Sequence, residues 1–214
     1  MEFRKIHNDR KKLLRENKEN DFVLVEGENK VMISAPHGVV QTRLGKSKYA
    51  ERGSLATALF LSKRKKTFLI AKTKNNFDDA NFDVVSPYKD AIDELATRGR
   101  INYLLDFHGL ASFRDCDINL GTNFEHNTEN DKRLLNILVK KLENADFKVS
   151  CDTPFKSGGT TVAGYTKQRH KNMWTIQIEI NCKITNEKEN FEKWKSLLEI
   201  FEEFIDMMIE KDLS

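Results

Sequence analysis

Cysteine, proline and long apolar runs are scarce in this sequence, and each scarcity excludes a class of protein. The three cysteines, Cys116, Cys151 and Cys182, form no C-x-x-C pair and leave one thiol over under any pairing, which argues against a disulfide framework. No apolar run approaches the roughly 20 residues of a membrane-spanning helix. The first residues, Met1–Lys5, are polar and lack the apolar core of a signal peptide. We therefore expect a soluble, cytoplasmic protein with no membrane partner.

An excess of either charge is also missing. Lys and Arg number 36 against 33 Asp and Glu, so the formal net charge is only +3. The one pooled basic run, Lys63–Lys66, lies where a predicted helix ends, and cations are favourable at the C-terminal end of a helix dipole. Because the remaining charges of both signs are interleaved, the sequence does not predict a nucleic-acid partner.

Glycine is sparse, with 10 residues, and one glycine-containing segment resembles a phosphate-binding loop. In Gly38–Ser47 a Gly-Lys-Ser triplet follows an apolar strand, but six residues separate the two glycines. A P-loop needs four, so that its backbone N–H groups can wrap the phosphate. No suitable second carboxylate follows, and nucleotide binding is therefore not predicted.

The order of apolar segments predicts one α/β domain. A chain of 214 residues is long enough for one well-buried domain and short for two, and no linker divides it, so we expect a single domain over 1–214. Within it, residues 1–20 form a charged N-terminal segment, expected to be a loosely attached helix. The predicted strands are Phe22–Glu26, Lys30–Ala35, Thr67–Ala71, Ile101–Phe107, Asp117–Gly121, Phe147–Cys151 and Trp174–Asn181, and the predicted helices are Leu55–Lys65, Tyr88–Arg98, Glu129–Glu143 and a long one at 187–211. This alternation predicts a three-layer α/β/α domain with a central mixed, mostly parallel sheet, of the phosphorylase/hydrolase-like kind.

Two of the five histidines lie where such a sheet builds a site. His37 and His108 each follow an apolar strand and each precede a glycine, which places both imidazoles at the C-terminal edge of the predicted sheet. His7, in the charged N-terminal segment, and His126, in a polar loop, are expected to be solvated. A pair of histidines at equivalent strand ends indicates metal ligation, although a single one there is usually structural.

Two glutamates complete the candidate site. Glu51 is expected at the start of a helix, where it would either ligate a metal or interact with the helix dipole. Glu179 alternates with isoleucines in a strand that reads as central, so its carboxylate needs a partner. A metal-bound water would be such a partner and would make Glu179 a general base; a Lys or Arg would be the structural alternative.

At these residues the sequence resembles the N-formylglutamate amidohydrolase family, whose members are similar to zinc carboxypeptidases in fold and site. The matching pieces occur in the family's order: Ser34-Ala35-Pro36-His37-Gly38, Glu51-Arg52-Gly53-Ser54, Asp106-Phe107-His108-Gly109 and Gln177-Ile178-Glu179-Ile180-Asn181. The resemblance implies one zinc ion per chain held by His37, Glu51 and His108, with a water in the fourth position. It also implies that Glu179 deprotonates this water and then protonates the departing amine.

The side chain of Asp106 shares a strand face with His108 and would either orient an imidazole or form a structural salt bridge. The resemblance further implies an arginine that binds a substrate carboxylate. Here the segment Asp79-Ala80-Asn81 is followed by Phe82 where that arginine should be. Asn81 is kept as a substrate-binding candidate, and the candidate arginines are Arg169, ranked first because its loop precedes the Glu179 strand, Arg114 and Arg98.

The sequence therefore predicts a zinc-dependent amidohydrolase for an N-formyl or N-acyl amino acid or a similar small-molecule or peptide substrate with a carboxylate. One alternative is a poly-γ-glutamate hydrolase or a carboxypeptidase-like peptidase, which an open groove would favour over a closed pocket. A second alternative is a descendant that binds a metal or ligand without turnover, and retention of Glu179 argues against it. The oligomeric state and the amide itself stay open.

Overall fold

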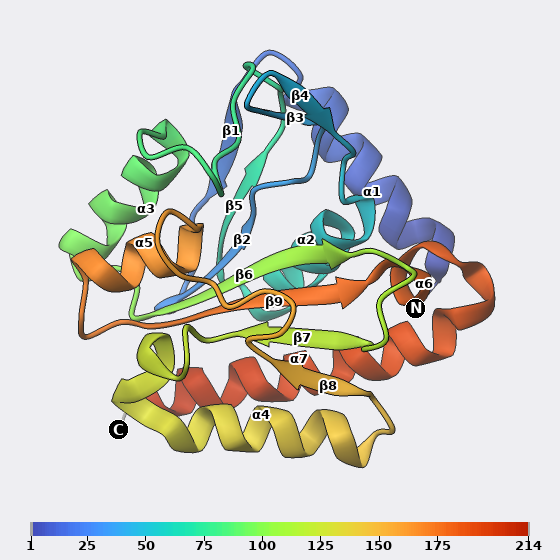
Figure 1. Ribbon diagram of the computed structural model, residues 1–214, viewed down its shortest axis with the longest axis vertical. Helices are drawn as coiled ribbons and strands as arrows, with labels where there is room; N and C mark the ends of the chain where they lie inside the picture. Colours follow the sequence, from blue (N-terminus) through green and yellow to red (C-terminus); the bar gives the residue numbers. More distant parts are fainter. Residues whose placement is uncertain (1, 214) are drawn as a thin grey trace.

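A computed structural model describes residues 2–213, and its centre is a seven-stranded sheet (Figure 1). The strand order is β1-β5-β2-β6-β9-β7-β8. The strands are β1 (Phe22–Val25), β2 (Val31–Ala35), β5 (Phe68–Lys72), β6 (Tyr103–Leu110), β7 (Ile118–Gly121), β8 (Val149–Cys151) and β9 (Trp174–Asn181). The inner strands β5, β2, β6 and β9 are parallel, whereas β1 runs antiparallel to β5 and β7 antiparallel to β9. The predicted mixed, mostly parallel sheet is confirmed.

Helices cover both faces of this sheet, as expected for three layers (Figure 1). One face packs against α2 (Arg52–Lys65), α4 (Lys132–Asn144) and α7 (Phe191–Leu213), and α1 (Phe3–Glu16) lies outside α2. The other face packs against α3 (Pro87–Thr97) and α5 (Val162–Arg169). The short helix α6 (Cys182–Asn186) and the 3-10 turns His126–Asp131 and Lys188–Asn190 complete the helical elements of the described chain.

Side-chain alternation in the inner strands explains why the sheet needs two covering layers. In β2, Val31 and Ile33 join the apolar core on the α2 and α7 face, and Met32 joins the core on the α3 face. Every residue of β2 is buried, as the continuous apolar run of a doubly covered strand requires. In β9, Trp174, Ile176, Ile178 and Ile180 join the core on the α7 face. The alternate residues of this strand are polar and lie on the opposite face.

The chain order places a topological switch point between β2 and β6. After β2 the chain passes through α2 to β5 on one side, and it then passes through α3 to β6 on the other side of β2. In open parallel sheets the C-terminal ends of two such strands border a crevice that ligands occupy. The fold thus brings together the segments that follow β2 and the end of β6.

Several local structures differ from the sequence-based expectation. The N-terminal helix is packed against α2 rather than loosely attached, because Ile6 and Arg10 are buried on its inner face. The connection after β2 is not a plain loop, since Gln41–Arg43 and Lys46–Lys48 pair as the antiparallel hairpin β3–β4. Helix α5 was not predicted, since it is short and its burial follows no clear amphipathic stripe. Among residues 2–213, no helix is both long and apolar enough to cross a membrane.

Candidate functional site

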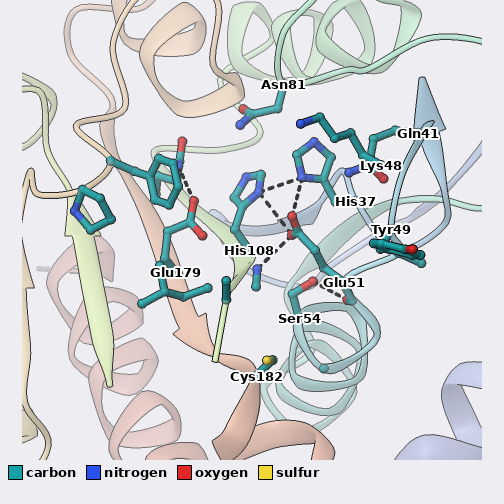
Figure 2. A pocket seen from close by; sticks show the side chains of 18 of the residues that line it. His37, Gln41, Lys48, Tyr49, Glu51, Ser54, Asn81, His108, Glu179 and Cys182 are labelled. Atoms are coloured by element: carbon teal, nitrogen blue, oxygen red, sulfur yellow. Dashed lines mark hydrogen bonds and ion pairs between the residues drawn. The ribbon is translucent and has the colours of Figure 1, made fainter. Parts of the chain in front are cut away.

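Three predicted ligand residues meet at the switch point, and each comes from a different element (Figure 2). His37 lies two residues after the end of β2, and His108 lies in the C-terminal half of β6. Glu51 is the residue immediately before α2, where the chain returns from the hairpin. Both imidazoles are almost fully buried, at 4% and 1% exposure. The sheet thus fixes His108, and the two ends of the connection between β2 and α2 fix His37 and Glu51.

The three side chains converge on one small space. The Nδ1 atom of His37 lies 2.8 Å from Oε1 of Glu51, and Nδ1 of His108 lies 3.4 Å from its Oε2. The two Nδ1 atoms face each other at 3.2 Å. The backbone N–H of Gly109 donates to Oε2 of Glu51 at 2.8 Å and holds the carboxylate in place. Candidate ligand atoms of the three residues all lie within 4.8 Å of one another.

A buried carboxylate stands behind each histidine. The Nε2 atom of His37 is 2.9 Å from Oδ1 of Asp79, and Nε2 of His108 is 3.0 Å from Oδ2 of Asp106. Each Nε2–H donates to its carboxylate, which fixes the orientation of the ring and directs Nδ1 towards Glu51. Asp106 also accepts from the Ser34 hydroxyl at 2.7 Å. The expected contact between Asp106 and an imidazole is therefore present.

The electrostatics of this cluster suit a cation. Burial alone would lower the pKa of His37, but the charge of Glu51 and hydrogen bonds with Asp79 and Glu51 outweigh burial and raise it to about 9. Burial would also lower the pKa of His108, which Asp106 and Glu51 instead hold well above its usual value. Since acidic groups outnumber the imidazoles, the cluster is negative unless a proton or a metal ion is bound. Two imidazoles and one glutamate are also a ligand set of catalytic zinc, so the residues present fit a divalent metal.

Glu179 lies beside the triad on the neighbouring strand. In the parallel register of β6 and β9, it is the partner of His108 (Figure 2). Its carboxylate is 5% exposed and accepts a 2.7 Å hydrogen bond from the Gln177 amide. Burial raises the pKa of Glu179 to about 7, with a further contribution from Glu51, against the opposing effect of His108. A carboxyl group with this pKa can both take up and release a proton near neutral pH.

A cavity of about 910 Å³ opens over the triad. Glu179, Gln177 and Asn81 line it together with the three candidate ligands, and the segment Pro154–Gly158 forms part of its wall. The charged groups at its sides are mostly basic: Arg43, Lys48, Arg52 and Lys156. Ser157, Gly158, Thr160 and Thr161, which precede α5 and the Glu179 strand in the chain, also line the cavity.

Of the predicted substrate-binding residues, only Asn81 lines the cavity, and Arg169 and Arg114 do not. Asn81 lines the cavity and accepts from the Val162 N–H through Oδ1, so its amide N–H₂ is left for a ligand. Arg169 does not line the cavity, since its guanidinium binds Asp93 at 2.6 Å. Arg114 is also outside the lining and stacks near Phe113. His7, expected to be solvated, is half-buried and donates to the Thr185 carbonyl at 3.0 Å.

Two residues that contribute to the site were not singled out from the sequence. Asp79 was noted only as part of an incomplete motif, and it proves to be fully buried against His37. Arg43 donates to Oδ2 of Asp79 at 2.8 Å and lies 5.0 Å over the ring of Phe82. Its guanidinium thus packs against the residue that replaces the expected arginine. Asp79 could have been found from the sequence, because it belongs to the same motif segment as Asn81. Arg43 could not, because it reaches the site only through the hairpin β3–β4, which the sequence does not predict.

Comparisons with known proteins confirm the resemblance that these residues suggested. Residues 82–185, a little under half of the chain, match the family model described as N-formylglutamate amidohydrolase. The matched range includes His108 and Glu179 and starts after His37 and Glu51. Among curated proteins, none matches the sequence at a significant level.

Solved structures with the same fold include several hydrolases. N-formylglutamate amidohydrolase from Ralstonia eutropha JMP134 has a TM-score of 0.63 at 14% identity, over 90% of this chain and 99% of that one. A bacteriophage poly-γ-glutamate hydrolase has a TM-score of 0.56 at 13% identity, over 91% and 94%. A metallo-carboxypeptidase from Burkholderia cenocepacia has a TM-score of 0.53 at 11% identity, over 94% and 69%. These likenesses establish the hydrolase-like fold, and with the family model they support hydrolase activity.

Proposed function

We propose that this chain is a zinc-dependent amide hydrolase whose substrate carries a carboxylate. The observation that supports this most is the convergence of His37, Glu51 and His108 beside a glutamate whose pKa lies near neutrality. The three candidate metal ligands, Glu179 and the proposed substrate-binding groups all line one cavity. Each residue then has one role in the cleavage of a C–N bond.

His37, Glu51 and His108 would hold the metal ion. When bound there, zinc supplies Lewis-acid chemistry: it withdraws electron density from a carbonyl oxygen and from a water molecule. Asp79 and Asp106 each accept the Nε2–H of one imidazole, so Nδ1 would be the atom that gives up its proton and ligates the metal ion. The Gly109 N–H keeps the Glu51 carboxylate turned towards them.

Glu179 would move the proton. In its ionised form its carboxylate accepts a proton from the attacking water, and in its protonated form it donates that proton to the departing nitrogen. A pKa of about 7 suits both steps, because neither form is strongly favoured at neutral pH. The Gln177 amide orients the carboxylate through one oxygen and leaves the other oxygen for the reaction.

Arg43 and Asn81 are the proposed contacts for the substrate carboxylate. Arg43 uses Nε and one Nη on Asp79, which leaves N–H groups on its outer edge free to bind an anion. Asn81 is held through its backbone N–H by the same Asp79, at 3.0 Å, and offers its amide N–H₂ to the cavity. Asp79 therefore connects a metal-binding histidine with both groups.

A polymeric or peptide substrate is the second candidate. The cavity volume of about 910 Å³ lies near the upper end of the range for small-molecule pockets, roughly 300–1,000 Å³. The basic residues Lys48, Arg52 and Lys156 add further positive charge to the cavity lining. A γ-glutamyl chain or an acidic peptide would use this extra space and charge. A binding protein without turnover is less well supported, because burial of Glu179 costs stability and a binding protein needs no general base.

The test uses the zinc-loaded protein and a substrate series: N-formyl and N-acetyl glutamate, γ-glutamyl oligomers, and peptides with a free C-terminus. We expect amine release from at least one series, and we expect Glu179→Gln to lower kcat by about 10²–10⁴-fold while metal content is unchanged. The variant Glu125→Gln, which alters an exposed carboxylate paired with Lys132, is the matched control. Unchanged kcat in Glu179→Gln would remove Glu179 as the base.

A further inference from the structure

A second cavity, which we call the α1 groove, lies beside the N-terminal helix. It has a volume of about 460 Å³ and is formed by α1, Arg52 at the start of α2, and Asn186 at the end of α6. Its charged lining residues are all basic: Arg4, Arg10, Lys11 and Arg52. No acidic side chain of the described residues lines it.

Arg10 is the residue of this groove that sequence alone does not explain. It is only 8% exposed, and its Nε atom is buried without a hydrogen-bond partner. Among residues 2–213 no carboxylate forms an ion pair with it, in contrast to Arg43 with Asp79 or Arg169 with Asp93. A buried guanidinium ordinarily has such a partner, because an uncompensated buried charge is costly.

The surroundings of Arg10 add positive charge instead of removing it. Burial lowers the pKa of Arg10, and the charge of Arg52 lowers it further. Burial is also the main cause of the lowered pKa of His7, and Arg10 and Lys11 are among the cations that add to it. Since a guanidinium remains protonated throughout the physiological range, Arg10 cannot relieve this repulsion by losing its proton.

We propose that the α1 groove is a binding site for an oxyanion group, a carboxylate or a phosphate, with Arg10 as its buried anchor. The guanidinium of Arg10 presents a planar set of N–H donors that matches either group. Arg52 and the exposed Arg4 and Lys11 surround the remaining oxygens with positive charge.

The groove is adjacent to the catalytic cavity, which bears on where the anion comes from. Arg52 and Asn186 line both cavities, and Arg52 directly follows the proposed metal ligand Glu51. The anionic group therefore belongs either to the remote end of an extended substrate or to a separate ligand. The site itself follows from Arg10 and does not depend on the proposed hydrolase function.

Titration calorimetry with inorganic phosphate tests the site directly. We expect binding to the wild-type chain that is weakened at least about 10-fold in Arg10→Gln and unchanged in Lys12→Gln. Lys12 lies on the same helix, is exposed and pairs with Glu16, outside the groove. His108→Ala should keep this binding, because it changes the candidate metal site and not the α1 groove. Phosphate bound at the metal site would be lost in this variant. Binding that survives in Arg10→Gln but disappears in His108→Ala overturns the proposal, as does no binding to the wild type.

A thermal melt keeps the test decisive if Arg10→Gln does not fold. Phosphate at ten times its dissociation constant should raise the Tm of the wild type by about 3–6 °C. The double variant Arg4→Gln/Lys11→Gln changes only exposed residues of the groove and should lose most of this rise. An equal rise in the double variant would contradict the proposal.

A competition experiment identifies the source of the anion once phosphate binding is established. If the groove holds the remote end of a substrate, phosphate should raise KM for a γ-glutamyl oligomer but not for N-formyl glutamate, and Arg10→Gln should remove this effect. If the groove holds a separate ligand, phosphate binding should stay intact with KM unchanged for both. In either case phosphate binding, and not turnover, decides whether the site exists, so a failure of the hydrolase proposal would be seen separately.

Discussion

The candidate metal centre and the α1 groove are two polar regions whose charged residues differ in sign. In the candidate metal centre both imidazoles lie against the carboxylates of Glu51, Asp79 and Asp106, and Glu179 adds a fourth acidic group. In the α1 groove the Nε atom of Arg10 is buried without a hydrogen-bond partner, and the charged side chains that line the groove are all basic. Glu51 and Arg52 are consecutive residues, so the chain passes from one region to the other within one peptide bond. The comparison suggests that the sign of the uncompensated charge predicts the sign of the ligand.

The largest expected effect follows from removing one acidic partner of the candidate metal centre. Asp79→Asn should weaken zinc binding or lower kcat/KM by about 10–100-fold, because His37 loses the charge that fixes its tautomer and Arg43 loses its partner. Zinc affinity and kcat/KM would be measured in parallel on the same preparations.

Asp93→Asn is the matched control, since Asp93 also binds one histidine, His170, and one arginine, Arg169, but does not line the cavity over the candidate metal centre. Equal losses in the two variants would show that the role of Asp79 is general stability and not support of the site.

A buried lysine sharpens the comparison, because a lysine can lose its proton and an arginine cannot. Lys89 is 1% exposed, its Nζ donates to the Asp83 carbonyl at 2.6 Å, and burial lowers its pKa to about 8. Between this pKa and the unfolded value of 10.5, the unfolded chain holds more protons, so stability should rise with pH. Relative to Lys89→Met, the unfolding free energy of the wild type should increase by about 2 kcal/mol between pH 7 and 9.5.

Denaturant titrations at several pH values measure this difference. Most of the increase should fall above pH 8, where the folded protein loses the proton of Lys89. A difference that is constant over the whole range would mean that Lys89 keeps an ordinary pKa in the folded chain.

The smallest expected effect concerns the cost of Arg10 itself. Arg10→Met keeps the length of the side chain and removes an uncompensated buried charge, so it should raise the unfolding free energy by about 1 kcal/mol and Tm by about 2–4 °C. Arg169→Met, which breaks an exposed ion pair with Asp93, should lower stability by no more than about 1 kcal/mol. If Arg10→Met instead lowered the unfolding free energy by about 3–5 kcal/mol, as the loss of a buried ion pair does, Arg10 would have a charged partner in the folded chain.

The sheet was predictable from the sequence because its inner strands are continuous apolar runs, and all seven predicted strands are present. The hairpin β3–β4 was not, since its residues are polar and pair only with each other. The packing of α1 also escaped prediction. Its segment reads as charged, although Phe3, Ile6, Leu13 and Leu14 recur at helical spacing and pack on the core. What this apolar pattern does not predict is the burial of Arg10 on the same face.

The candidate site was predictable to the extent that it lies at strand ends. His37 and His108 were placed by the strands that precede them, and Glu179 by alternation within β9. The arginine beside Asn81 could not be predicted, because the hairpin that carries Arg43 is far from it in sequence and the pairing with Asp79 arises only in three dimensions.

Elemental analysis of the purified protein after zinc reconstitution tests the central claim most directly. The wild type, Glu179→Gln and Lys48→Ala, which changes a cavity residue outside the triad, should each hold about one zinc ion per chain. His37→Ala and His108→Ala should hold none after dialysis while remaining folded. Zinc retained at the wild-type level in both histidine variants, or no zinc taken up by the wild type, would contradict the account.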